Sequence, residues 1–148
     1  MSKPLWTFEG FETDAGNQVV QEWYWSDIGI DQRDDIRTRV AYIENVEQNL
    51  WKEPHFKFFG DIGEIRKRTP VGALRVYGYF PADRPHVFVI LNGDLKKSDK
   101  DRQGVETARL RLKKLQQGRG RTHGFDFDEK PANEIPPEQD DETPSSIQ

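Results

Sequence analysis

Apolar residues recur every three or four positions in three stretches of the chain, which is the spacing of one face of a helix. We therefore predict helices over residues 13–25, from residue 31 to just before Pro54, and over residues 98–118. Ser98 or Asp99 is the expected N-cap of the third helix, because both side chains can accept a hydrogen bond from a free backbone N–H.

Four shorter segments have the composition of strands: residues 5–9, 62–68, 73–80 and 86–91. Residues 73–80 alternate, so that one face carries Leu74, Val76 and Phe80 and the other carries Arg75, Tyr77 and Tyr79. Residues 86–91 are apolar on both faces, which is typical of a central strand covered on both sides. Turn signals separate the last three segments, and this order predicts an antiparallel meander.

The order of these elements predicts an α+β fold. We expect a small antiparallel sheet, a meander of three to four strands, packed against two N-terminal helices and followed by a C-terminal helix. Residues 1–118 form one domain in this interpretation, and residues 119–148 form an acidic, disordered tail rich in Gly and Pro. Phe125 and Phe127 are apolar exceptions in that tail and can form a short docking segment.

The formal net charge of -4 conceals a strong segregation of charge along the chain. Residues 64–121 hold 15 Lys and Arg against 6 Asp and Glu, whereas the segments before and after are acidic. A basic block of this kind predicts a polyanionic partner, with phosphate as the usual anion, unless it is simply a solvated face.

Other features of the composition limit the chemistry. The absence of cysteine excludes disulfides, thiolate catalysis and cysteine–zinc sites. The three histidines lack metal-ligand spacing, and no glycine-rich phosphate loop is present, so we expect no metal and no cofactor. No apolar run has membrane-spanning length and the first residues lack a signal-peptide core, which predicts a cytoplasmic protein without a membrane partner.

Basic residues inside predicted strands are the candidates for function. Cleavage of RNA without a metal needs a group that orients the 2′-hydroxyl, fixed positive charge at the phosphate, and a proton donor for the leaving oxygen. Arginine and lysine supply these groups, and tyrosine on a sheet can stack a base. We assign catalysis to Arg66, Arg75, Lys96 and Lys97, and RNA binding to Tyr77, Arg68, Tyr79 and Lys100. Alternatively, Arg66 is a structural salt-bridge partner of Glu64 or of a carboxylate on the second helix, and Tyr77 and Tyr79 pack against the last helix.

Several short motifs occur in a defined order. They are Gly-Glu-Ile-Arg66, Ala-Leu-Arg75-Val-Tyr77, a hydrophobic strand that leads to Lys96-Lys97, and Glu106-x-Ala108-x-x-Arg111. In this order the chain resembles the RelE/ParE toxin superfamily, most closely its HigB-like branch of phage-derived Gp49-like proteins, over about residues 17–116. The resemblance implies a toxin of a type II toxin–antitoxin pair that cleaves translated mRNA on the ribosome without a metal.

The same resemblance implies partners and roles. Arg66 and Arg75 would bind the scissile phosphate, Lys96 and Lys97 would assist as cationic or acid–base groups, and the partners would be a helix-turn-helix antitoxin, the ribosome and mRNA. The sequence departs from the branch at residues 92–95, where Asn-Gly-Asp-Leu replaces the usual His-Gly-Phe before the lysines. Two alternatives stay open: a non-enzymatic basic-sheet binder, such as a ParE-like gyrase inhibitor, and a phage-encoded interaction protein.

Overall fold

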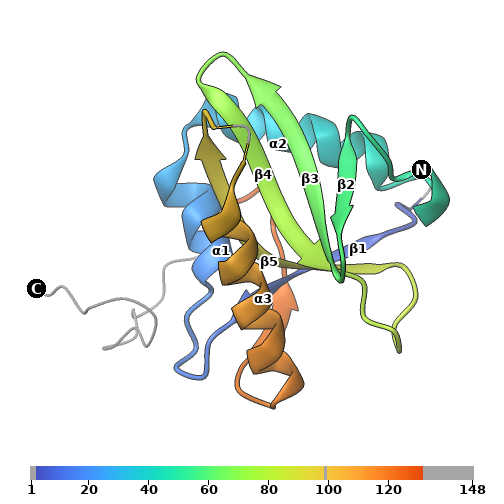
Figure 1. The fold of residues 1–148 in the computed structure, drawn as a ribbon, viewed down its shortest axis with the longest axis vertical. Coiled ribbons are helices and arrows are strands. Elements are labelled where there is room, and N and C mark those ends of the chain that lie inside the picture. The colour runs from blue at the N-terminus through green and yellow to red at the C-terminus, as the bar shows by residue number, and fades with distance from the viewer. Residues whose placement is uncertain (1–2, 99, 132–148) are drawn as a thin grey trace, which may run out of the picture.

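The computed structural model describes residues 3–98 and 100–131 (Figure 1). In chain order the elements are β1 (Thr7–Glu12), α1 (Val19–Glu22), a π-helical turn (Trp23–Asp27), α2 (Ile30–Ile43), a 3-10 turn (Gln48–Leu50), β2 (Phe56–Phe59), β3 (Ile62–Thr69), β4 (Gly72–Tyr79), β5 (Val87–Lys96), α3 (Arg102–Gln116) and β6 (Arg121–Gly124). None of the described helices is both long and apolar enough to cross a membrane.

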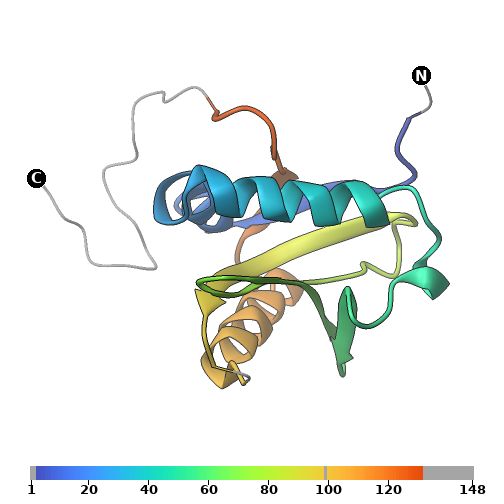
Figure 2. The same ribbon diagram turned by 90° about the horizontal axis from the view of Figure 1, so that it is seen from above.

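The strands form a single mixed sheet in the order β2-β3-β4-β5-β1-β6. β1 runs parallel to β5, and every other neighbouring pair is antiparallel. Figure 2 shows α1 and α2 on one face of the sheet and α3 on the other. The α+β class is therefore confirmed, with helices on both faces.

Two clusters of buried side chains lie on opposite faces of the sheet, as the alternation within the strands dictates. Leu74 and Val76 of β4 join the cluster under α1 and α2, whereas Tyr77 joins the cluster under α3. β5 contributes Phe88 and Ile90 to the first cluster and its intervening residues to the second. The predicted faces of residues 73–80 and the double covering of residues 86–91 are confirmed.

The antiparallel meander is present as β3, β4 and β5, but the sheet has six strands instead of three to four, and β1 joins it in parallel with β5. β2 was not among the predicted strands; it is a short edge strand that is aligned by its pairing with β3, as in Phe56 opposite Ile65. β6 lies in the predicted tail and pairs with β1. Both strands depend on partners elsewhere in the chain, so their own short sequences give a weak signal.

Residues 119–131 also correct the expectation of a disordered tail that begins at residue 119. β6 extends the sheet, and the chain beyond it packs on α1, where Gln21 Nε2 donates to the Asp126 carbonyl at 2.8 Å. Phe125 and Phe127 pack against the first cluster, which confirms them as a docking segment. The ordered unit thus extends past the predicted boundary at residue 118, and residues 132–148 lie outside the described residues.

The helices are shorter than the sequence predicts. Residues 13–18 form a turn in which the Asn17 N–H donates to Thr13 Oγ1 at 3.1 Å, so the first helix begins only at Val19. The second helix ends at Ile43, well before Pro54. The N-cap of α3 is Asp101, whose side chain accepts from the Gly104 N–H; it is not Ser98, and Asp99 lies outside the described residues.

Candidate functional site

The face of the sheet under α3 carries an array of mostly polar side chains near the N-terminal end of α3. We call this array the polar grid. The strand register places them in three rows, each running across neighbouring strands. The rows are Lys57–Glu64–Tyr77–Asn92, Arg66–Arg75–Asp94 and Arg68–Ala73–Lys96. Arg66 and Arg75, which the sequence placed on adjacent strands, are therefore direct cross-strand neighbours.

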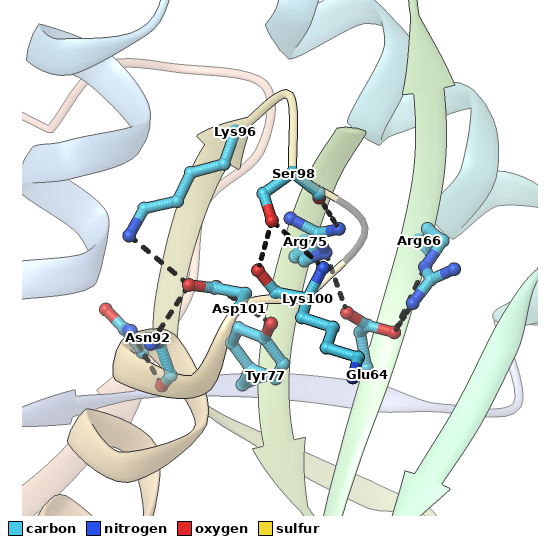
Figure 3. A network of polar contacts seen from close by, with 10 residues as sticks. Glu64, Arg66, Arg75, Tyr77, Asn92, Lys96, Ser98, Lys100 and Asp101 are labelled. Atoms are coloured by element: carbon cyan, nitrogen blue, oxygen red, sulfur yellow. Dashed lines mark hydrogen bonds and ion pairs between the residues drawn. The ribbon is translucent and has the colours of Figure 1, made fainter. Parts of the chain in front are cut away.

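A carboxylate links the two central arginines. Glu64 and Arg75 each have side chains that are only 1% exposed, and Arg75 Nε lies 3.2 Å from Glu64 Oε2. The other oxygen of Glu64 accepts from Arg66, with Nη2 at 2.9 Å. Arg75 Nη2 also donates to the Ser98 carbonyl at 2.6 Å (Figure 3). Two guanidinium groups share one carboxylate, so Arg66, Arg75 and Glu64 together carry one net positive charge.

The environments of the two arginines differ. The side chain of Arg66 is 27% exposed, so its guanidinium group is accessible to a ligand in solution. Arg75 lies beneath it, and its Nη1 is buried without a hydrogen-bond partner among the described residues. Burial of an unsatisfied polar atom costs free energy, and such atoms in native structures often mark functional positions. Arg66 is therefore the accessible cation of the pair, and Arg75 is the buried one.

Asp101 organises the start of α3 beside these arginines. Its carboxylate accepts from the Gly104 N–H at 3.1 Å and from the Tyr77 hydroxyl at 2.9 Å, and Lys96 Nζ lies 3.3 Å away. Burial alone would raise the pKa of Asp101, but hydrogen bonds from Asp94, Tyr77, Gly104 and Lys96 outweigh it and lower this pKa to about 2. Asp101 is thus a buried anion held by four donors.

Asp94 is the neutral partner of that anion. Burial, its hydrogen bond with Asp101 and repulsion by the charge of Asp101 raise the pKa of Asp94 to about 8. Asp94 therefore keeps its proton at neutral pH, and its O–H donates a hydrogen bond to the carboxylate of Asp101. Burial and the bond to Asp101 also raise the pKa of Tyr77, which keeps its hydroxyl a donor.

A cleft opens between the polar grid and the first turns of α3, with a volume of about 380 Å³. Six of its lining side chains are cationic and three are acidic, which leaves a positive excess at its walls. The cations are Lys57, Arg66, Arg75, Lys100, Arg102 and Arg109. The acids differ in exposure: Glu64 and Asp101 are buried in ion pairs, whereas Glu106 is exposed.

The eight predicted site residues do not all meet in this cleft. Arg66, Arg75, Tyr77 and Lys100 line it. Lys96 is adjacent but bonds to Asp101, and Lys97 is exposed at the end of β5 without lining the cleft. Arg68 lines a neighbouring hollow. Tyr79 is half-buried against the cluster under α3, as the packing alternative predicted.

The sequence interpretation missed Lys57, Arg102 and Arg109 as cleft residues. Lys57 lies outside the predicted strands, and Arg102 and Arg109 lie on the last helix, which was not connected with the site. The spacing of Arg102, Val105, Glu106 and Arg109 on one helix face, next to a basic sheet, was a usable signal. The salt bridge between Arg66 and Glu64, which was the structural alternative for this arginine, is present.

Within residues 3–98 and 100–131, no three His, Asp or Glu side chains gather in a way that could hold a metal ion. Comparison of the chain with protein-family models, with curated proteins and with solved structures finds no match.

Proposed function

We propose that the cleft binds the phosphate backbone of single-stranded RNA, and that the protein is a metal-free endoribonuclease that acts on translated mRNA as the toxin of a toxin–antitoxin pair. The observation that supports this most directly is the cross-strand pair of Arg66 and Arg75, which share the single carboxylate of Glu64 in a cleft whose lining has more cations than acids. The toxin role itself comes from the resemblance of the motifs to the RelE/ParE superfamily.

The charge of the cleft supports a phosphate ligand. Arginine forks donate two parallel hydrogen bonds to phosphate oxygens, and they keep their charge at any physiological pH. Lys57, Lys100 and Arg109 line the same cleft from other parts of the chain, so a bound phosphate meets more than one positive charge. A cleft of about 380 Å³ falls within the usual range of small-ligand sites and can admit one nucleotide.

The same residues can support cleavage by attack of the 2′-hydroxyl. In this scheme Glu106, the exposed carboxylate of the cleft, accepts the proton of the 2′-hydroxyl. Arg66 stabilises the additional negative charge of the phosphorane-like transition state, with Arg75 beneath it. Lys100 donates a proton to the leaving 5′-oxygen. The bond from phosphorus to that oxygen breaks as the bond to the 2′-oxygen forms, which leaves a 2′,3′-cyclic phosphate.

A second candidate function is binding without cleavage, as in a gyrase inhibitor or a plain RNA binder. One observation favours it: four of the predicted site residues already have partners. Arg66 and Arg75 form ion pairs with Glu64, and Arg75 also donates to the Ser98 carbonyl. Tyr77 and Lys96 both contact the carboxylate of Asp101. Groups held in this way can shape a surface without taking part in proton transfer.

The test combines purified protein, ribosomes and a translated mRNA, and maps cleavage by primer extension. We expect cuts with the wild-type chain and about a hundredfold slower cutting with Arg66→Ala. Lys113→Ala, which removes one exposed cation from the last turn of α3, is the matched control and should cut at the wild-type rate. Expression of the wild-type chain alone should arrest growth, and a helix-turn-helix antitoxin should relieve it.

Two results would contradict the enzyme proposal. Intact mRNA together with undiminished RNA binding would identify the protein as a binder. Intact mRNA together with inhibition of DNA supercoiling would support the gyrase alternative.

A further inference from the structure

A second basic hollow adjoins the cleft at the edge of the sheet. Its volume is about 230 Å³, and it lies where the chain before β2 runs beside the end of β3, with the Arg66 N–H donating to the His55 carbonyl at 3.0 Å. The lining residues are Arg39, Glu53, Pro54, Lys57, Arg66 and Arg68. Four of these six residues are cations and one is an acid.

The two hollows are joined by shared side chains. Lys57 and Arg66 line both the cleft and the edge hollow. A continuous basic track therefore runs from α3 over the polar face of the sheet to the edge of β3, where Arg39 of α2 closes it. Two concave basic sites bridged by common cations match a linear polyanion better than a single small anion.

Arg39 gives an independent indication of an anion in the edge hollow. Its Nε is buried and has no hydrogen-bond partner among the described residues. Burial lowers the pKa of Arg39, with only a small opposing effect from Tyr42. A buried guanidinium N–H without an acceptor is costly, and an anion in the hollow would supply one.

We infer that the edge hollow is a second phosphate subsite, which holds one phosphate of a single-stranded RNA while a neighbouring phosphate of the same strand lies in the cleft. This inference rests on the proposed function. The composition of the hollow favours a nucleic-acid backbone over an acidic peptide. Pro54 is its one apolar lining residue, and protein partners usually need aromatic or aliphatic anchors.

The experiment measures the binding of labelled oligouridylates of two and eight nucleotides by fluorescence anisotropy. The oligomers carry 2′-deoxyriboses, so that they cannot be cleaved by 2′-hydroxyl attack. The test variant is the double substitution Arg39→Gln and Arg68→Gln, and the control is Lys113→Gln on α3. Thermal unfolding of each variant is recorded to show that it is folded.

For the double variant we expect about a tenfold loss of affinity for the octamer and less than a twofold change for the dimer, because only the octamer can span both hollows. The slope of log K against log salt for the octamer should fall by about 0.7, the value for one phosphate contact on a single strand. The control variant should bind both oligomers as the wild type does.

Unchanged octamer binding by the double variant, with wild-type binding intact, overturns the second subsite and leaves the cleft proposal standing. Equal losses for dimer and octamer overturn it too, because they indicate a general loss of positive charge. Selective loss of octaglutamate binding, with octauridylate binding retained, would assign the hollow to an acidic protein partner. If the wild-type protein binds neither oligomer, the proposed function itself fails.

Discussion

The two faces of the sheet bury different kinds of side chain. The face under α1 and α2 is packed with aromatic rings, among them Trp6, Trp51, Phe56 and Phe88, with ring centroids 4.6–6.2 Å apart. The face under α3 buries Glu64, Arg75 and Asp101 as well as apolar residues. Aromatic packing stabilises a fold through burial of apolar surface, whereas a buried charge costs free energy unless an opposite charge and hydrogen bonds compensate it. The contrast indicates that the first face provides stability, whereas the second holds the charged groups of the proposed site.

The largest effect is expected on the aromatic face. Phe88 is fully buried and its ring contacts those of Phe8, Trp51, Phe56 and Phe80. Phe88→Ala should lower the free energy of unfolding by about 4 kcal/mol, because it leaves a cavity among the rings. Urea denaturation measures this, and Phe88→Leu should cost much less. A loss below about 1 kcal/mol for the alanine variant would show that this face is not the stabilising one.

The buried ion pair gives the next largest effect. Glu64→Gln leaves Arg75 buried without its compensating charge and should cost about 3 kcal/mol in urea denaturation. The double variant Glu64→Leu with Arg75→Met should recover most of this stability, yet it should bind RNA poorly. If the apolar pair is as unstable as Glu64→Gln, the buried charges are needed for the fold, and the face under α3 also contributes to stability.

The Asp94–Asp101 pair makes stability depend on pH. Because the pKa of Asp94 rises to about 8 on folding, the folded state binds its proton more tightly than the unfolded state does. The free energy of unfolding should therefore fall as pH rises from about 4 to about 8, and then level off. The loss should be about 2 kcal/mol once solvent screening is allowed for.

The control for this pH dependence is Asp94→Asn, which keeps the shape of the side chain and a donor to Asp101. Its free energy of unfolding should no longer fall across the same pH range, and it should rise slightly because burial lowers the pKa of His123. A slope equal to that of the wild type would assign the pH dependence to another group.

The smallest effect on stability is expected at Arg66. Its side chain is partly exposed, and Glu64 keeps Arg75 as a partner when Arg66 is removed. Arg66→Ala should change the free energy of unfolding by less than about 1 kcal/mol, while the affinity for an uncleavable oligouridylate falls about tenfold. Loss of stability and of affinity in the same proportion would show that Arg66 acts through the fold alone.

The meander and the faces of its strands could be predicted because their signal is local. Residues 73–80 alternate, and residues 86–91 are apolar throughout, so both strands and their faces follow from side-chain period alone. β2 and β6 could not be found in this way. Each has four residues and forms through pairing with a strand that its own sequence does not specify.

The candidate site was predictable to a similar extent. The basic strands pointed to Arg66 and Arg75, but their cross-strand contact and shared carboxylate depend on register, which a one-residue slip would abolish. The roles of Lys96 and Asp101 depend on where α3 begins. The cap at Asp101, rather than at Ser98, turns Lys96 toward a carboxylate and away from the cleft.

The position of β1 has a consequence for how the chain folds during synthesis. β1 is made first, yet its partners are residues 87–90 on one side and residues 121–124 on the other. Contacts of such long sequence separation form slowly, and N-terminal segments leave the ribosome well before C-terminal ones. The nascent protein therefore carries an open strand edge at Glu9–Glu12 until β6 emerges, and a chain that stops at residue 118 keeps that edge open permanently.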